Sequence, residues 1–271
     1  MSTSETSWLE TMPEIYDRHL GPTLFAPYAE HVSALAAALS PQCVLEIAAG
    51  TGITTAALIR RLPGAAITAT DLNPAMVEWA RRAVTGAGWR QADAESLPFA
   101  DGSFDLVVCQ FGVMFFPDRR RAFAEAARVL ASDGTFLFTS WDVVQASTLT
   151  AALVDSLAAV LHDDAPTFIT RVPHGYTQPD QIRQDLEAAG LRPGRVDRVV
   201  LSGTTASARF LTEGFCLGTP LRFELEERGP LDRLTAALAE EMTSRLGSGP
   251  ITGEMAAFVV SAGKPGPAEP S

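Results

Sequence analysis

Hydrophobic and polar positions follow two different periods along residues 43–141. Short apolar runs of strand length, several with β-branched residues, recur at 43–47, 66–70, 89–92, 104–109 and 135–141. Segments with helical spacing separate most of them, at 51–62, 74–84 and 119–130. Strands that alternate with helices of this length predict βαβ units. We therefore expect an α/β fold with a doubly wound, mostly parallel sheet, which later strands at 196–201 and 251–261 extend to seven.

The pattern is mainly helical on both sides of this region. Residues 13–39 have helical spacing with breaks at Gly21-Pro22 and near Pro27, and helices are expected at 147–161, 179–189 and within 205–246. The apolar stripe expected to pack on the sheet consists of Val32, Leu35, Ala36 and Leu39. We expect these divisions: an N-terminal helical lid (1–40, with 1–12 mobile), an α/β core (41–141), helical cap elements with the last two strands (142–262), and a disordered tail (263–271).

Composition and charge exclude several kinds of partner. The net charge of −11 argues against nucleic acid, because phosphate contacts need clustered Lys and Arg. The short run Arg119-Arg120-Arg121 is expected to be a solvated helix turn, with capture of an acidic substrate group as the alternative. No apolar run is long enough for membrane insertion, and no signal peptide is visible. Three scattered cysteines indicate neither a disulfide framework nor a metal site, so we expect a cytoplasmic protein.

The candidate ligand site is the turn after the first strand, Ala48 to Gly52. Two glycines there allow a ligand to lie against bare backbone at the carboxyl edge of the sheet. Asp71 ends the second strand about twenty residues later, where an acid accepts hydrogen bonds from ribose hydroxyls. Asp93 follows the third strand and could accept from a purine amine. A nucleoside-containing cofactor is therefore expected at this edge.

The glycine turn alone also fits a nicotinamide-dependent oxidoreductase. That class usually carries a third glycine, whereas this turn is Gly50-x-Gly52-x-x-Thr55. The missing glycine weakens the dinucleotide alternative without removing it.

Five motifs in register resemble the class I S-adenosylmethionine-dependent methyltransferases, which have a Rossmann-like fold. They are Glu46–Gly52, Ala69–Pro74, Ala92–Phe99, Ser103–Val108 and Arg128–Leu130. The segment Leu97-Pro98-Phe99 with the following Ser103-Phe104-Asp105 is similar to the ubiquinone and menaquinone methyltransferases and other small-molecule enzymes of that class. The resemblance covers residues 43–141 closely.

The resemblance implies a set of cofactor-binding residues. The methionine part of the cofactor would lie along the backbone of Ala48, Ala49, Gly50 and Thr51. Asp71 would hold the ribose, with Leu72 and Met76 against the adenine and Asp93 and Ala94 at its edge. Gln110 and Phe111 would face the sulfonium. Glu46 and Tyr16 complete the predicted set.

One residue departs from the family pattern, which often has glycine where this chain has Ala48. A methyl group disfavours the backbone angles that glycine alone adopts readily. We therefore expect the turn to begin in an ordinary backbone conformation.

The acceptor side of the site has weaker sequence signals. An activated sulfonium methyl needs alignment with its acceptor more than an acid–base group, so no triad or metal cluster is required. The candidate catalytic side chains are those of His174, Tyr176, Tyr16 and His19. Aromatic residues after the fourth strand and in the helical insert, among them Phe115 and Phe210, suggest an apolar or aromatic acceptor pocket, with ordinary packing between cap and core as the alternative.

The sequence thus predicts methyl transfer from S-adenosylmethionine to a small, hydrophobic or aromatic metabolite, with S-adenosylhomocysteine as the product. A nicotinamide-dependent oxidoreductase and a non-catalytic cofactor-binding module are the alternatives. The acceptor, the methylated atom (C, O or N), the use of a general base, and the choice between monomer and homodimer are left open.

Overall fold

A computed structural model of the chain describes residues 3–265, with side chains from Thr11 onward. Contacts divide the chain into two compact units. The core unit comprises Ala29–Trp141, Tyr176–Val199 and Ala257–Ser271, and the helical unit comprises Met1–Tyr28, Asp142–Gly175 and Val200–Ala256. The predicted division into lid, core, cap and tail stays a prediction, and most of the predicted disordered tail (266–271) lies outside the described residues.

The expected α/β fold with a seven-stranded sheet is confirmed, in the order β3-β2-β1-β4-β5-β7-β6. The strands are β1 (Cys43–Glu46), β2 (Ala66–Asp71), β3 (Gly88–Gln91), β4 (Phe104–Gln110), β5 (Leu130–Trp141), β6 (Arg192–Thr205) and β7 (Ile251–Gly263). Strands β1 to β5 pair in parallel, and β7 runs antiparallel to β5. The last two strands are longer than their apolar runs suggested.

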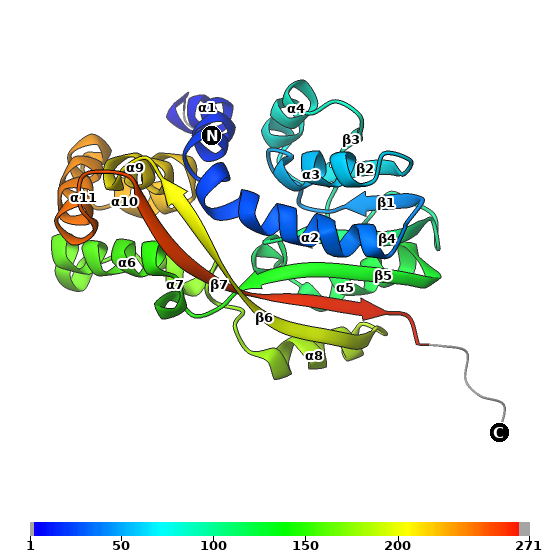
Figure 1. Cartoon of the computed structure of the whole chain (residues 1–271). Helices are drawn as coiled ribbons and strands as arrows, with labels where there is room; N and C mark the ends of the chain where they lie inside the picture. The colour runs from blue at the N-terminus through cyan, green and yellow to red at the C-terminus, as the bar shows by residue number, and fades with distance from the viewer. Residues whose placement is uncertain (1–2, 266–271) are drawn as a thin grey trace. The chain divides into compact units, whose positions relative to one another are not determined.

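Helices cover both faces of the sheet in the core unit. On one face, α2 (Ala26–Ala38) and α3 (Ile53–Arg61) pack on Val44, Leu106 and Leu137. On the other, Phe123 of α5 (Arg119–Val129) contacts Phe136 and Phe138 of β5. Figure 1 shows α2 and α5 on opposite sides of the strands. The helices α4 (Pro74–Ala83) and α8 (Pro179–Ala188) complete this unit.

The stripe predicted for α2 is only half right. Val32 and Ala36 are fully buried in the core cluster, but Leu35 is 39% exposed and Leu39 is 49% exposed. The helix buries Ala29 and Ser33 beside Val32 instead. Small residues therefore form the packed face, and the larger leucines lie at its margin.

The helical unit is built mainly of α-helices. Its elements are α1 (Thr3–His19), a π-helical turn (Gly21–Phe25), α6 (Thr148–Leu161), α7 (Phe168–Arg171), α9 (Ala208–Gly218), α10 (Leu221–Glu226) and α11 (Leu231–Leu246). Helix α1 already begins at Thr3, and the expectation that residues 1–12 are mobile stays a prediction. The break at Gly21-Pro22 is confirmed, since the π-helical turn separates α1 from α2.

Two glycines fix how α1 packs within this unit. A Cβ atom on Gly214 would lie 2.6 Å from the Cβ of His19, and one on Gly218 would lie 3.0 Å from the backbone nitrogen of Tyr16. Both glycines lie on α9, one helical turn apart. Helices α1 and α9 therefore approach to backbone contact at the turn that carries Tyr16 and His19.

Candidate functional site

Gly50 and Gly52, in the turn between β1 and α3, have different structural roles. Both have left-handed backbones, with φ of +57° at Gly50 and +88° at Gly52. A Cβ on Gly52 would lie 2.8 Å from the Trp89 ring, whereas one on Gly50 would meet no atom within 4 Å. Gly52 is thus needed for packing, and Gly50 faces open space at the carboxyl edge of the sheet.

Thr55 explains why the turn lacks a third glycine. Its hydroxyl donates a hydrogen bond of 2.6 Å to the carboxyl of Glu46, the last residue of β1. Both side chains are buried, so this bond joins the first turn of α3 to the strand. A glycine at this position would remove the bond, which distinguishes the turn from a three-glycine dinucleotide motif.

Ala48 overturns the expectation of an ordinary backbone, because its φ is +54°. The chain is fixed on both sides of it: the Ile47 N–H donates to the Val108 carbonyl and the Ala49 N–H donates to the Thr70 carbonyl. These bonds to β4 and β2 impose the left-handed conformation on an alanine, at a cost of about 1–2 kcal/mol. Phe111, after β4, is also left-handed at +54°. Non-glycine residues held this way cluster at ligand sites.

We expect Ala48→Gly to raise the free energy of unfolding by about 0.5 kcal/mol, because relief of the left-handed strain exceeds the added entropy of the unfolded chain. Urea unfolding measures this. The matched control is Ala49→Gly, at a residue without a positive φ, which should lower stability by about 1 kcal/mol. If both variants lost stability equally, Ala48 would carry no strain.

Asp71, at the end of β2, links the glycine turn to the start of α4. One carboxylate oxygen accepts from the Gly50 N–H and the other from the Asn73 N–H, both at 2.8 Å. Burial raises the pKa of this carboxyl above its usual value, and N–H donors from Asn73, Gly50 and Leu72 oppose that rise. Each oxygen keeps a second lone pair, so the group can still accept from a pair of ligand hydroxyls.

Asp93 follows β3, in a turn that side chains of α5 bind through hydrogen bonds. One of its carboxylate oxygens accepts from the Glu95 N–H at 2.9 Å, and the residue is exposed. Arg128 donates to the carbonyls of Leu97 and Phe99 and pairs with Glu125. The Leu-Pro-Phe and Arg-Val-Leu motifs are thus linked in the structure, since the arginine of one motif holds the loop of the other.

Gln110 ends β4, and Phe111 follows it beside the glycine turn. The Phe111 ring stacks on Trp141 at a centroid distance of 3.6 Å, and its N–H donates to the Thr139 hydroxyl. Sequence analysis missed Trp141, because nothing in the sequence pairs it with Phe111. The stack makes a rigid aromatic wall at the ends of β4 and β5.

Side chains at this edge fit a nucleoside ligand. The Thr51 hydroxyl is buried with no hydrogen-bond partner among the described residues. Leu72 is 63% exposed directly after Asp71, and Met76 of α4 is buried. A ligand with polar and flat apolar parts suits this edge, which offers an unpartnered hydroxyl, an exposed apolar side chain next to Asp71 in sequence and the open space over Gly50. The predicted residues Ala49 and Ala94 contribute small side chains to the same turns.

Tyr16 and His19 lie together on α1, within the helical unit. The Tyr16 ring stacks on Phe25 at 4.9 Å, and the His19 ring stacks on Phe210 at 4.1 Å. His19 Nδ1 lies 3.0 Å from the Ile15 carbonyl, and Nε2 lies 3.8 Å from a Glu213 carboxylate oxygen. Both side chains are therefore fixed by packing within α1 and its neighbours.

His174 and Tyr176 have separate surroundings despite their closeness in sequence. His174 Nδ1 lies 2.5 Å from the Asp142 carbonyl, so this nitrogen carries the proton and donates. Burial lowers the pKa of His174, while the hydrogen bond to Asp142 and its charge oppose that shift. The fully buried Tyr176 donates its hydroxyl to Asp185, and burial raises its pKa. A catalytic role of Tyr176 stays a prediction.

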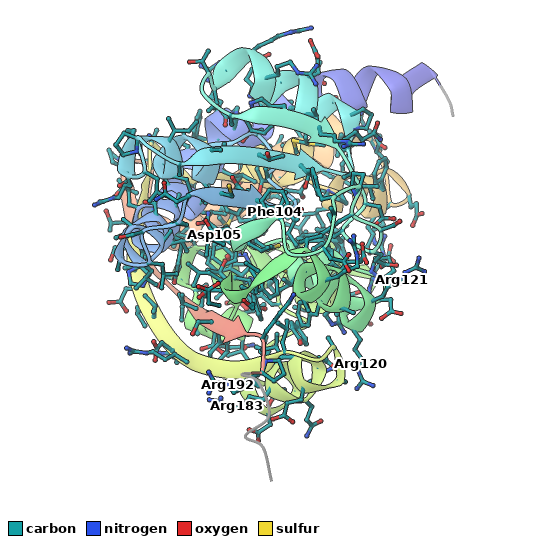
Figure 2. The ribbon with its side chains drawn as sticks, turned by 90° about the vertical axis from the view of Figure 1, so that its right-hand side faces the viewer. Phe104, Asp105, Arg120, Arg121, Arg183 and Arg192 are labelled. Carbon is teal, nitrogen blue, oxygen red and sulfur yellow. The ribbon has the colours of Figure 1, made fainter. Side chains whose placement is uncertain are left out.

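All three arginines at the start of α5 make contacts within the core unit. The Arg119 guanidinium lies 4.4 Å from the centre of the Tyr176 ring, Arg120 pairs with Asp185 at 2.8 Å, and Arg121 donates to the Glu95 carbonyl. Figure 2 labels Arg120 and Arg121 on this helix. These contacts favour a structural role over capture of an acidic substrate.

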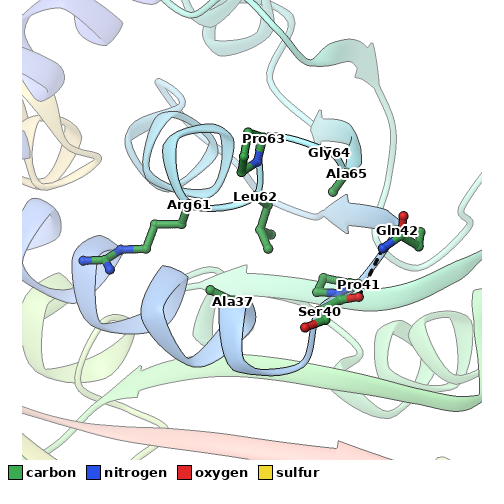
Figure 3. A pocket seen from close by; sticks show the side chains of 9 residues that line it. All are labelled: Ala37, Ser40, Pro41, Gln42, Arg61, Leu62, Pro63, Gly64 and Ala65. Atoms are coloured by element: carbon green, nitrogen blue, oxygen red, sulfur yellow. Dashed lines mark hydrogen bonds between the residues drawn. The ribbon is translucent and has the colours of Figure 1, made fainter.

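The cavity drawn in Figure 3 lies at the other edge of the sheet. It has a volume of about 230 Å³ and is lined by Ala37, residues 40–42 and residues 61–65. Those two segments precede β1 and β2, whereas the glycine turn follows β1 and Asp71 is the last residue of β2. The cavity is therefore separate from the candidate site, and Arg61 is its only charged lining residue.

No helix among the described residues is long and apolar enough to cross a bilayer. In the same part of the chain, no cluster of three His, Cys, Asp or Glu side chains could hold a metal ion.

Comparisons with known proteins agree on the class of the core. Residues 45–138 match the family model described as a methyltransferase domain. A malonyl-[acyl-carrier protein] O-methyltransferase of Geobacter sulfurreducens is 38% identical over 157 residues, which are 57% of this chain and 57% of that protein. A demethylmenaquinone methyltransferase of Thermus thermophilus is 40% identical over 104 residues, which are 37% of this chain and 47% of that protein. The chain thus spans about half the length of these curated relatives.

A solved structure shares the fold at low identity. The phosphoethanolamine N-methyltransferase 2 of Haemonchus contortus, solved with phosphomonomethylethanolamine and S-adenosylhomocysteine, superposes with a TM-score of 0.57 at 18% identity. The superposition covers 94% of this chain and 57% of that one. At this identity the likeness extends to the fold alone.

Proposed function

We propose that this chain, which belongs through residues 45–138 to the class I S-adenosylmethionine-dependent methyltransferases, transfers a methyl group from S-adenosylmethionine to a small hydrophobic or aromatic metabolite. The observation that carries the proposal is the carboxyl edge of three adjacent strands. There Gly50 faces open space after β1, Asp71 ends β2, and Asp93 follows β3. An acid for the ribose beside a bare glycine turn suits a nucleoside ligand.

The predicted cofactor residues of the first three strand ends have defined roles in this proposal. The backbone from Ala48 to Thr51 borders the methionine part, and the Thr51 hydroxyl gains a partner there. Asp71 accepts from the ribose, and the exposed Leu72 covers the adenine. Asp93 accepts from the adenine amine, with Ala94 beside it. When bound, S-adenosylmethionine supplies an electrophilic methyl group for in-line displacement by the acceptor.

An apolar acceptor is supported by exposed aromatic surface after β4. Phe115 is 47% exposed in the loop that begins at Phe111, although most large apolar side chains of the core unit are buried. Aromatic faces of this kind bind apolar rings and also attract a sulfonium cation. The relatives act on different acceptors by their names, a carrier-bound malonyl group and a menaquinone precursor, so the acceptor of this chain needs its own test.

The decisive experiment supplies S-adenosylmethionine with a deuterated methyl group to the full chain and an extract of small metabolites. We expect S-adenosylhomocysteine to accumulate and one metabolite to gain the labelled methyl by mass spectrometry. Binding of a nicotinamide dinucleotide in place of S-adenosylmethionine would support the oxidoreductase alternative. Tight binding of S-adenosylmethionine without any turnover would support a non-catalytic module.

His174 and Tyr16 are proposed to act on the acceptor side. His174 is held neutral by burial, with its Nδ1 proton donated to Asp142, so Nε2 carries the lone pair a base needs. We expect His174→Ala to lower kcat at least about tenfold and Tyr16→Phe to lower it less, with the Kd for S-adenosylmethionine within about threefold of wild type. Steady-state kinetics and calorimetry measure the two quantities, with His162→Ala, at an imidazole in a short surface turn, as control. Unchanged kcat in both variants would remove these residues from the reaction.

A further inference from the structure

Glu46 is a carboxyl enclosed between three strands and a helix. As the last residue of β1 it is paired with Ala69 of β2 and Val108 of β4, and it is 1% exposed. The Thr55 hydroxyl of α3 donates to one of its oxygens at 2.6 Å. Glu46 precedes Gly50 by four residues, and its hydrogen bond to Thr55 joins the strand before the glycine turn to the helix after it.

No cation balances this carboxyl. None of the salt bridges among the described residues includes Glu46. The titratable groups that face it are Asp71 on β2 and Cys109 on β4, while α3 contributes only the Thr55 hydroxyl. Burial raises the pKa of Glu46 to about 8; the Thr55 hydrogen bond opposes this rise, and the Asp71 carboxylate contributes to it. Burial also raises the pKa of Cys109, so its thiol stays neutral. Glu46 is therefore mostly protonated at neutral pH.

We propose that Glu46 distinguishes the methyl donor from its product by charge: it loses its proton when a sulfonium ligand binds on the glycine turn and regains it when the neutral thioether replaces that ligand. This inference rests on the proposed function. S-adenosylmethionine carries a sulfonium, an ammonium and a carboxylate, a net charge of +1, and S-adenosylhomocysteine lacks the sulfonium charge. In a buried setting, a nearby cation stabilises the ionised carboxylate strongly.

The proton balance gives the direction of the pH effect. The donor complex holds one proton fewer than the free protein, and that proton passes to the buffer. Donor affinity should therefore rise with pH, by up to about tenfold per unit, and level off above about pH 8. Product affinity gains no such dependence from Glu46. The ionised Glu46 carboxylate stabilises the bound sulfonium but not the neutral thioether. Methyl transfer removes the sulfonium charge, so the product is released more readily than the donor.

Calorimetric titrations in two buffers of different ionisation enthalpy, at pH 7, count the protons released. We expect wild type to release about 0.9 proton more than Glu46→Gln when S-adenosylmethionine binds, and the two proteins to differ by close to zero with S-adenosylhomocysteine. Glutamine keeps an oxygen for the Thr55 hydroxyl. The ligand's own amino group, with a pKa near 8, contributes equally to both proteins and cancels.

Asp185→Asn is the matched control, since Asp185 is 4% exposed but paired with Arg120. It should release as many protons as wild type. If Glu46→Gln fails to fold, the ratio of donor to product affinity in wild type between pH 6 and pH 9 tests the same inference, and a constant ratio overturns it. Equal proton release by wild type and Glu46→Gln, with donor binding intact, overturns the inference and leaves the proposed function standing. Binding of neither ligand overturns both.

Discussion

Asp71→Ala should weaken S-adenosylmethionine binding by at least about 100-fold in calorimetric titrations. The carboxylate is proposed to accept two ribose hydroxyls, and hydrogen bonds to a charged group contribute on the order of 1.5–3 kcal/mol each. The variant also loses the acceptor for the Gly50 N–H, which loosens the turn that borders the methionine part. Both effects lower affinity in the same direction, so this is the largest change we expect from a single carboxyl.

Asp105→Ala separates ligand contact from loss of structure. Asp105 lies at the start of β4 and is labelled in Figure 2. One of its carboxylate oxygens accepts the N–H groups of Gln42 and Cys43, at 2.8 and 2.9 Å. Like Asp71 it caps two backbone donors, but at the opposite edge of the sheet. We expect Asp105→Ala to lose similar stability and to keep its affinity. Equal affinity in wild type and Asp71→Ala would remove the ribose assignment.

The strands and helices of the core could be predicted because their signals are local. Buried parallel strands appear as short apolar runs, and helices between them show a 3.6-residue period. The phase of α2 was less predictable, because Ala29, Val32 and Ala36 face the sheet while the larger Leu35 stays at the margin. Periodicity predicts that a helix has an apolar stripe. Which residues of that stripe pack on the sheet depends on the space available there.

The candidate site was predictable in its positions but not in its conformations. Residues that follow parallel strands meet at one edge, so Asp71 and Asp93 could be assigned to the glycine turn before the structure. The left-handed Ala48 could not, because its φ is imposed by bonds to Val108 and Thr70 that are distant in sequence. The neutral state of Glu46 follows in the same way from burial by three separate strands, a property of the assembled sheet.

Gly50→Ala should reduce S-adenosylmethionine affinity by about 100-fold while it lowers stability by only about 1 kcal/mol. The stability cost comes from a Cβ at a φ of +57°, since no atom lies within 4 Å of that Cβ. The affinity cost is expected because we propose that the ligand approaches the backbone in this open space, and overfilling such a contact costs on the order of 2–3 kcal/mol.

Gly190→Ala provides the control that isolates these two costs. Gly190 follows α8 with a φ of +79°, and its Cβ would also meet nothing within 4 Å. Both variants place an alanine at a positive φ, but the Gly190 Cβ would lie in open space outside the glycine turn. Urea unfolding should therefore give equal losses of stability, and calorimetry should show an affinity loss for Gly50→Ala alone. Wild-type affinity in Gly50→Ala would mean that the ligand does not lie over this turn, because no bound molecule in van der Waals contact with Gly50 could accommodate the added methyl group unchanged.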